Sequence, residues 1–222
     1  MTLVVLKAGG RVATGTAAEV HALRGAGVKV CVVHGAGPQI SAEMKRRGLE
    51  IVFVGGRRVT TEAGLCVVRE ALAEVNRELC AAIGECAIGF MGDDLGLPAR
   101  HVPALGLVGE PLPAAPPPVE AALAEGLVPV VAPLATGPLN VNADDAAAAL
   151  AVGLGAERLL FVTDVPGVLV GGAPLGALAA DEADELLGAG RFEGGIVPKL
   201  EAAVRAARLG IRAEIGVTAV VP

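Results

Sequence analysis

Short runs of β-branched residues alternate with longer alanine-rich stretches along almost the whole chain. Runs of the first kind predict buried strands, and stretches of the second kind predict helices. The alternation is typical of a parallel sheet with helices on both faces, because a crossover helix joins successive parallel strands. The strands are expected at residues 2–6, 28–34, 51–54, 86–90, 105–108, 128–133, 159–163 and 213–221, and the helices at residues 17–26, 38–47, 60–80, 119–125, 143–154, 181–188 and 198–209. We therefore predict an α/β fold, a three-layer αβα sandwich around a mainly parallel central sheet.

The composition excludes several classes of protein. Hydrophobic residues make up 53% of the 222 residues, so the chain can bury a large core and is not disordered. It has no Trp, no Tyr and four Phe, and 18 basic residues against 24 acidic ones give a net charge of -6. Both features argue against a nucleic-acid partner, which requires excess positive charge and often aromatic side chains. An anionic ligand must therefore be held by a local arrangement of donors.

Three further features bear on the compartment. The longest uncharged run, residues 126–143, contains three prolines, so we do not expect it to cross a membrane. No secretory signal precedes the first predicted strand. The four cysteines show no C-x-x-C spacing, which favours reduced thiols. We therefore expect a cytoplasmic protein without membrane contact.

Two glycine-rich turns follow predicted strands directly. They are Lys7-Ala8-Gly9-Gly10 and His34-Gly35-Ala36-Gly37-Pro38. Glycine lets the backbone approach an anion closely, and a following helix directs free N–H groups toward it. Neither turn is a Walker A loop, because the pattern G-x-x-x-x-G-K-[ST] does not occur. Taken singly, each of the two turns is more simply explained as an ordinary strand-to-helix turn. We interpret His34, at the start of the second turn, as a structural residue.

Two of the four lysines lie beside glycine turns. Lys7 precedes Gly9-Gly10, and Lys199 follows Gly194-Gly195 at the start of a predicted helix. A lysine in the first turn of a helix opposes the helix dipole, so a solvated surface position explains Lys199 poorly. Two ammonium groups that converge on one phosphate would account for both lysines.

Three polar clusters are further candidates for ligand binding. Asn140, Asn142 and Asp144 precede or begin an apolar helix, and helix capping does not explain all three. Arg57-Arg58 follows a predicted strand and could bind a carboxylate bidentately, although two solvated surface charges explain the pair equally well. Residues 163–169 form a turn at the carboxyl edge of the predicted sheet, where open α/β folds bind ligands.

Ten short motifs follow one another along the chain in a fixed order. They are KAGG at Lys7, HGAGP at His34, GRRVT at Gly56, VNRELC at Val75, GFMGDD at Gly89, GLVGE at Gly106, VPVVAPL at Val128, NVNADDAAAALA at Asn140, LLFVTDVPGVL at Leu159 and GGIVPKLEAA at Gly194. In this order they resemble the motifs of the amino acid kinase family. The match is collinear from residue 2 to about residue 209, so it is specific although each motif is short.

The resemblance implies a reaction. Within the family, the motifs are most similar to those of the branch that uses ATP to phosphorylate the side-chain carboxylate of N-acetyl-L-glutamate in arginine biosynthesis. Such a transfer requires in-line placement of the reactants and neutralisation of charge on the γ-phosphoryl oxygens. By resemblance, Lys7 and Lys199 hold the transferring phosphoryl group, and Asp144 orients both lysines. ATP and Mg²⁺ are the implied cofactors, with Mg²⁺ bridging the phosphates and few direct protein ligands.

The resemblance also assigns binding residues and two lobes that share one sheet. The residues assigned to the acyl substrate are Ala36, Gly37, Arg58 and Asn140, with Arg58 on the α-carboxylate. Those assigned to the nucleotide are Gly9, Gly10, Asp164, Val165, Pro166, Gly167, Val168, Leu169, Gly194 and Gly195. Residues 1–138 are then expected to form the lobe that binds the acyl substrate and makes a dimer interface. Residues 139–222 are expected to form the nucleotide lobe.

The chain departs from the family pattern in two places. Ala36 replaces the middle one of three glycines, and its methyl group is tolerated without strain only if its φ is negative. The segment between the last predicted helix and the final strand is short after Ile211. Arginine-sensitive members carry an additional N-terminal helix that builds a hexamer, and Lys7 lies too close to Met1 for such a helix. We therefore expect a homodimer that is insensitive to arginine.

Two alternative functions stay open at this point. One is a kinase for aminoadipate or glutamate attached to an acidic carrier protein, which the net charge of -6 disfavours by repulsion. The other is a non-catalytic nucleotide-binding sensor on the same fold. The combination of Lys7, Lys199 and Asp144 argues against a sensor, because a protein that only binds nucleotide does not need all three.

Overall fold

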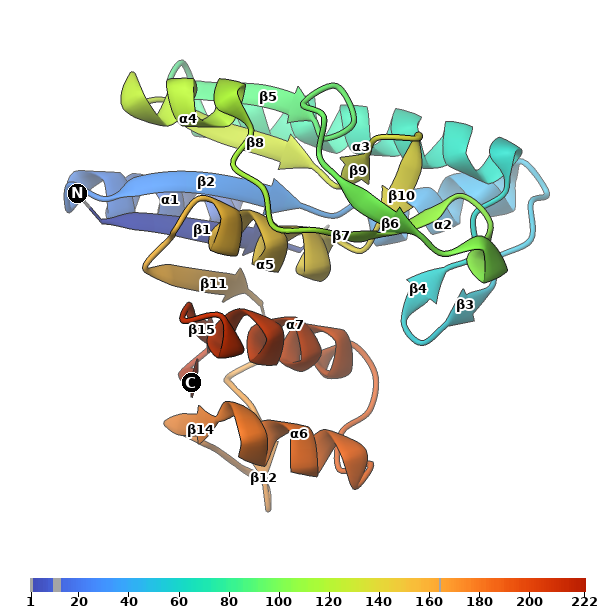
Figure 1. The fold of residues 1–222 in the computed structure, drawn as a ribbon. Helices are drawn as coiled ribbons and strands as arrows, with labels where there is room; N and C mark the ends of the chain where they lie inside the picture. Colours follow the sequence, from blue (N-terminus) through green and yellow to red (C-terminus); the bar gives the residue numbers. More distant parts are fainter. Residues whose placement is uncertain (1, 10–12, 164) are drawn as a thin grey trace.

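The central sheet of the computed structural model, which describes residues 2–9, 13–163 and 165–222, contains eight strands. They are β1 (Leu3–Ala8), β2 (Lys29–His34), β5 (Ala87–Met91), β8 (Val128–Ala132), β11 (Arg158–Val162), β14 (Ala177–Ala179), β15 (Arg212–Ile215) and β16 (Thr218–Val221). Their order is β14-β16-β15-β11-β1-β2-β8-β5, and Figure 1 shows them stacked from β5 at the top to β14 at the bottom. Neighbouring strands run parallel apart from the antiparallel pair β15 and β16. The predicted mainly parallel sheet is confirmed.

In the described parts of the chain, seven α-helices cover the two faces of this sheet. They are α1 (Ala13–Gly25), α2 (Gly37–Arg46), α3 (Glu62–Ile83), α4 (Pro117–Ala124), α5 (Ala143–Gly153), α6 (Ala180–Gly188) and α7 (Ile196–Arg208). All seven predicted helices are therefore present, with ends shifted by a few residues. None of the helices within the described residues has the length and apolar character needed to cross a membrane.

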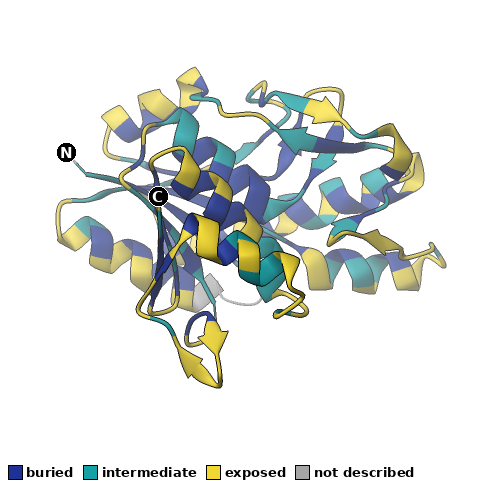
Figure 2. Ribbon diagram, turned by 60° about the horizontal axis from the view of Figure 1, so that its bottom comes forward, coloured by how far each residue is buried: buried dark blue, intermediate teal, exposed yellow. Residues whose placement is uncertain are grey.

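Alternate residues of the strands build two separate cores. On β1, Val4 and Leu6 pack with α1, α2 and α3, whereas Val5 packs with the core formed by α4, α5, α6 and α7. This period of two is expected of a strand that is covered on both faces. Figure 2 shows the buried residues gathered on the strands and on the inner faces of the helices. The predicted three-layer αβα sandwich is confirmed.

A second sheet of four strands was not predicted. Its strands are β6 (Ala99–His101), β7 (Val108–Pro111), β9 (Leu134–Ala135) and β10 (Leu139–Val141), in the order β6-β7-β10-β9. The prediction of a strand at residues 105–108 is wrong, because Pro103–Leu105 forms a 3₁₀ turn, η1, and β7 begins at Val108. Strands of two to four residues show too little alternation to be recognised in a sequence.

A small hairpin stands where a strand was predicted at residues 51–54. Its strands are β3 (Phe53–Val54) and β4 (Arg57–Arg58), which pair antiparallel. Gly55 and Gly56 join them with φ of 54° and 74°, values that glycine adopts without strain. A two-residue turn with both φ positive matches the twist of a hairpin. The turn therefore fixes the position of Arg57 and Arg58.

The prediction of one strand at residues 213–221 is also wrong. Two strands, β15 and β16, occupy this segment and pair antiparallel. Gly216 lies in the turn between them, with a φ of 56° and its Cα close to the backbone of Pro166. A further hairpin, β12 (Leu169–Val170) and β13 (Ala173–Pro174), precedes β14. These local pairings depend on turns whose flanking strands are too short to predict.

Candidate active site

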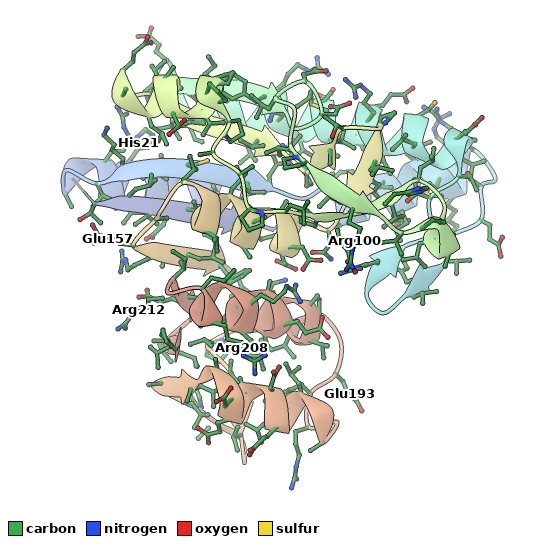
Figure 3. The ribbon with its side chains drawn as sticks, in the orientation of Figure 1. His21, Arg100, Glu157, Glu193, Arg208 and Arg212 are labelled. Atoms are coloured by element: carbon green, nitrogen blue, oxygen red, sulfur yellow. The ribbon has the colours of Figure 1, made fainter. Side chains whose placement is uncertain are left out.

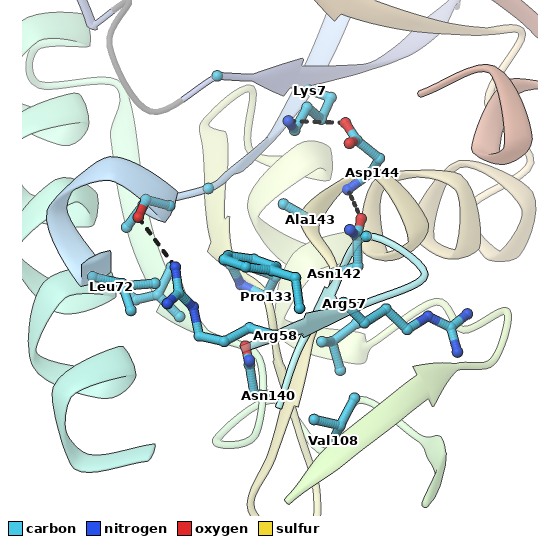
Figure 4. Close-up of a pocket in the computed structure, with 18 of the residues that line it drawn as sticks. Lys7, Arg57, Arg58, Leu72, Val108, Pro133, Asn140, Asn142, Ala143 and Asp144 are labelled. Carbon is cyan, nitrogen blue, oxygen red and sulfur yellow. Dashed lines mark hydrogen bonds and ion pairs between the residues drawn. The ribbon is translucent and has the colours of Figure 1, made fainter. Parts of the chain in front are cut away.

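A cavity of about 320 Å³ lies at the carboxyl ends of β1 and β2. Open α/β sheets bind ligands at this edge. Figure 4 shows side chains from distant parts of the chain directed into the cavity. The predicted site residues that line it are Lys7, Gly9, Ala36, Gly37, Arg58, Asn140, Asp144 and Lys199.

One carboxylate holds both candidate lysines. Nζ of Lys7 lies 2.8 Å from Oδ1 of Asp144, and Nζ of Lys199 lies 3.6 Å from Oδ2 of the same side chain. Lys7 ends β1 and Lys199 lies in the first turn of α7, so the carboxylate links two elements that are far apart in the sequence. With all three groups ionised the trio has a net charge of +1. It therefore favours an anion in the cavity.

The start of α5 fixes Asp144. Asn142 caps this helix, and its Oδ1 accepts hydrogen bonds from the backbone N–H of Asp144 at 2.8 Å and of Asp145 at 3.2 Å. Both aspartates lie in the first turn, where the helix dipole stabilises negative charge. Capping thus accounts for Asn142, and Asp144 remains available to the two lysines.

Arg58 is buried and extends from β4 into the cavity. Its Nη2 donates to Oγ of Ser41 at 2.7 Å and to the carbonyl oxygen of Gly37 at 3.3 Å, and its guanidinium carbon lies 4.6 Å from the ring centroid of Phe53. Burial lowers the pKa of Arg58. Within the described residues no carboxylate forms an ion pair with Arg58, and a buried charge without a counter-ion is costly. A carboxylate on a ligand would supply the missing counter-ion.

Asn140 is connected to the backbone of Arg58 through a threonine. Its Nδ2 donates to Oγ1 of Thr60 at 2.9 Å, and this hydroxyl donates to the carbonyl oxygen of Arg58 at 2.8 Å. Figure 4 shows Asn140 beside Arg58 at the wall of the cavity. Thr60 is a residue of the site that the sequence analysis did not single out, although it belongs to the GRRVT motif.

Ala36 meets the condition stated for its methyl group. Its φ is -139°, so the side chain is accommodated without left-handed strain. Ala36 is the N-cap residue of α2, and Gly37 and Pro38 begin the helix. Gly37 at this helix start lines the cavity, where the N-terminal end of the helix dipole favours an anion.

A larger cavity of about 840 Å³ adjoins the first one and shares Gly9, Pro38 and Lys199 with it. Of the predicted nucleotide residues, Val165, Gly167, Leu169 and Gly195 also line it, whereas Gly10 and Asp164 lie outside the described residues. Pro166, Val168 and Gly194 do not line it. The N–H of Val168 donates to Oγ1 of Thr218 at 2.8 Å, so this residue holds the loop in place.

Part of this larger cavity was not predicted from the sequence. Thr163 belongs to the predicted turn at residues 163–169, whereas the lining residues Val162, Arg191, Phe192, Glu193 and Ile196 are additional. Most of them flank the predicted turns at residues 163–169 and 194–195, so proximity to these turns was the available signal. Only the folded chain shows which of them face the cavity.

His34 lies behind the site. It is fully buried, and its Nε2 lies 3.1 Å from Nδ2 of Asn76, which also donates to the carbonyl oxygen of Val130 at 2.9 Å. Burial is the main cause that lowers the pKa of His34 from 6.5 to about 4; the charge of Lys7 acts in the same direction, and a hydrogen bond with the backbone of Gly35 opposes it. The imidazole is therefore neutral at pH 7. His34 lines neither cavity, in agreement with a structural role.

The buried imidazole predicts a pH dependence of stability. Between pH 6.5 and about 4 the unfolded chain binds a proton at His34 that the folded chain excludes. The free energy of unfolding should therefore fall as the pH drops through this window, by about 3 kcal/mol from this group. Urea unfolding at pH 7 and pH 4 measures the loss. In the His34→Gln variant the difference between the two pH values should be smaller by this amount, and an equal difference would contradict the prediction.

The chain belongs to the amino acid kinase family, because the profile of that family matches residues 2–216. Among curated proteins, the acetylglutamate kinase of Rubrobacter xylanophilus is 42% identical over 97% of this chain and 88% of that protein. The acetylglutamate kinase of Frankia casuarinae is 40% identical over 94% of this chain, which spans 64% of that relative. Among solved structures, smu.665 from Streptococcus mutans UA159 has a TM-score of 0.89 at 26% identity, covering 99% of this chain and 98% of that one.

Proposed function

We propose that this chain transfers the γ-phosphoryl group of ATP to the side-chain carboxylate of N-acetyl-L-glutamate, giving N-acetyl-L-glutamyl 5-phosphate and ADP in arginine biosynthesis. Support comes from the two relatives named acetylglutamate kinase, at 40% and 42% identity. The observation that carries the proposal is the Lys7–Asp144–Lys199 trio at the junction of two cavities, with the buried Arg58 in the smaller one.

The two cavities suit the two substrates. In the proposed complex Arg58 binds the α-carboxylate of N-acetyl-L-glutamate in the smaller cavity, where none of the described carboxylates pairs with its buried charge. The nucleotide occupies the larger cavity, and its γ-phosphoryl group lies near Lys199, which borders both. On this proposal residues 1–138 provide most of the acyl-substrate site, and residues 139–222 provide most of the nucleotide site.

The chemistry requires charge neutralisation rather than proton transfer. A glutamate side chain has a pKa near 4.3, so the attacking carboxylate is already ionised at pH 7 and needs no general base. Lys7 and Lys199 neutralise the γ-phosphoryl oxygens during transfer, and Asp144 keeps both ammonium groups in place. The N–H groups at the start of α2 add donors that are fixed before the substrate binds.

Mg²⁺ is proposed to accompany ATP. The parts of the chain that the structure describes hold no group of three His, Cys, Asp or Glu side chains able to bind a metal ion. In the proposed complex the phosphates of ATP are the main ligands of the ion, as is common for Mg²⁺. When bound, Mg²⁺ neutralises charge on the β- and γ-phosphates. The predicted homodimer and cytoplasmic location also remain proposals, and light scattering that gives twice the 22.0 kDa of one chain would support the dimer.

The test of the proposed function is an acceptor comparison. Purified protein is incubated with Mg-ATP, hydroxylamine and one of four acceptors, which are N-acetyl-L-glutamate, glutamate, aspartate and aminoadipate. We expect ADP release and a hydroxamate with N-acetyl-L-glutamate alone, because hydroxylamine traps an acyl phosphate. Nucleotide binding without turnover on any acceptor would contradict the proposal and favour the carrier-linked kinase or the sensor.

Arg58→Lys is expected to raise KM for N-acetyl-L-glutamate by about tenfold or more with a smaller change in kcat. A lysine is a point charge and cannot replace the two parallel hydrogen bonds of a guanidinium, a loss of about 1.5–3 kcal/mol. Steady-state kinetics with varied acyl substrate measures the effect. Arg77→Lys on the exposed face of α3 is the control. An unchanged KM in Arg58→Lys would remove Arg58 from the substrate site.

A further inference from the structure

A group of ionised side chains lines a third cavity of about 380 Å³, and one of them, Arg57, also borders the smaller substrate cavity. Its members, here called the outer ion cluster, are Arg57, Arg100, Glu110, Asp145 and Arg205. They form a continuous chain of ion pairs in which Arg100 pairs with Glu110, Glu110 with Arg57, Arg57 with Asp145, and Asp145 with Arg205. Arg100, the first residue in this series of ion pairs, lies on β6 and is labelled in Figure 3.

Three of the elements that carry proposed functional groups, β4, α5 and α7, also contribute to the outer ion cluster. On β4, Arg57 precedes Arg58, and Figure 4 shows the two side chains directed to opposite sides. On α5, Asp145 follows Asp144 in the first turn. On α7, Arg205 lies six residues after Lys199. The cluster therefore connects the backbones that position the substrate arginine, the orienting carboxylate and the phosphoryl-binding lysine.

Asp145 is the central member of the cluster. Its side chain is 9% exposed, and Nη2 of Arg57 lies 3.3 Å from its Oδ2 while Arg205 pairs with its Oδ1. Burial raises the pKa of Asp145, and the charges of Arg205 and Arg57 oppose this shift. Ion pairs at buried positions contribute little net stability but specify geometry in some proteins. A carboxylate that pairs with arginines from two different elements can fix the relative position of those elements.

The β3–β4 hairpin depends on such restraints. Its two strands have two residues each, and Phe53 and Val54 are both 53% exposed, so apolar packing holds it weakly. Nη1 of Arg57 lies 2.5 Å from Oε1 of Glu110 on β7. Glu110 and Asp145 together fix the outer side of the hairpin through Arg57. On the inner side the hydrogen bonds of Arg58 to described residues go to uncharged groups of α2, namely Ser41, Gly37 and Met44. Loss of the outer restraint would therefore let Arg58 shift.

We propose that Asp145 is a positioning residue. By holding Arg57 and Arg205, it fixes the positions of β4 and α7 relative to α5. Arg58 on β4 is thereby aligned with Lys199 and Asp144. The inference rests on the proposed phosphoryl transfer. Displacement of a reacting group by about 1 Å can lower a rate by about a hundredfold, so even partial release of the hairpin or α7 is measurable.

Two arginines on α7 provide a matched comparison. Arg205 belongs to the cluster, whereas Arg208 pairs with Asp181 and Asp184 of α6, and Figure 3 shows it between the two helices. Their side chains are similarly exposed, at 47% and 50%. We expect Arg205→Gln to lower kcat by about tenfold and to raise KM for N-acetyl-L-glutamate by about fivefold, whereas Arg208→Gln should change either by less than about twofold. Arg205→Lys should recover most of the loss.

The change in KM separates positioning from general stabilisation. Arg205 lines neither substrate cavity, so its effect on the acyl substrate must pass through Asp145 and Arg57 to β4. A purely structural role would lower the urea midpoint and leave KM of the folded enzyme unchanged. Because Arg57 and Arg205 act through one carboxylate, the combined Arg57→Gln and Arg205→Gln variant should lose about as much kcat/KM as the worse single variant. Losses that multiply would overturn the inference.

Hydrogen exchange tests the linkage without turnover. Exchange of the backbone amides in residues 53–60 should become faster in Arg205→Gln than in the wild type, and should be unchanged in Arg208→Gln. Unchanged exchange and unchanged KM in Arg205→Gln overturn the positioning role. A wild-type protein that phosphorylates none of the four acceptors overturns the proposed function, and the exchange comparison then still decides whether Asp145 links α7 to the hairpin.

Discussion

Replacing Lys199 with alanine should lower kcat by about a hundredfold or more and leave the affinity for ATP within a few-fold of the wild type. The ammonium group contacts Asp144 and lies where the two cavities meet, so its interaction with the γ-phosphoryl oxygens strengthens as charge moves during transfer. A contact made mainly in the transition state affects kcat, whereas ground-state binding also depends on the rest of the nucleotide cavity.

Two quantities are measured: kcat from initial rates, and the dissociation constant of Mg-ATP under conditions without turnover. Lys45→Ala is a suitable control, because Lys45 lies exposed on α2. Lys7→Ala should show the same pattern, with an additional loss of stability, since Lys7 is buried and lies closer to Asp144. Near-normal kcat in Lys199→Ala would contradict the two-lysine mechanism.

The sequence predicted the layers of the fold better than their edges. Strands such as β1, β2 and β8 are buried on both faces and appear as continuous apolar runs, and all seven helices were long enough to recognise. The second sheet and the hairpins consist of strands of two to four residues, which depend on tertiary pairing. The pairing of β15 with β16 likewise depends on the turn at Gly216, which is hard to recognise within the mostly apolar segment 213–221.

The site shows a similar division. Lys7, Lys199 and Asp144 could be singled out because glycine turns and a helix start gave them unusual local settings, and the structure brings them together in one cavity. By local sequence alone Arg57 and Arg58 are equivalent, and only the family resemblance selected Arg58 for the substrate. The hairpin shows how they differ, because Arg58 bonds Ser41 of α2 whereas Arg57, which also borders the cavity, extends to Glu110 and Asp145. The role of Asp145 could not be predicted either, because it depends on Arg205, which lies 60 residues away.

Asp144→Asn should impair both stability and turnover. The substitution keeps the size of the side chain and removes the charge that Lys7 pairs with at 2.8 Å. Lys7 is then left buried without a counter-ion, which typically costs about 3–5 kcal/mol of unfolding free energy. The amide also fails to hold two ammonium groups, so we expect kcat to fall by about a hundredfold or more. Urea unfolding and initial rates measure the two effects separately.

A second substitution distinguishes the two contributions. In the combined Lys7→Met and Asp144→Asn variant both members of the buried pair are neutral, so most of the lost stability should return. Turnover should stay at least as low as in Asp144→Asn, because the ammonium group of Lys7 is absent as well. Recovery of stability without recovery of kcat would show that the trio acts on the transferring phosphoryl group and does not merely support the fold. If kcat returned together with stability, the lysine and the aspartate would be structural, and the proposed mechanism would be wrong.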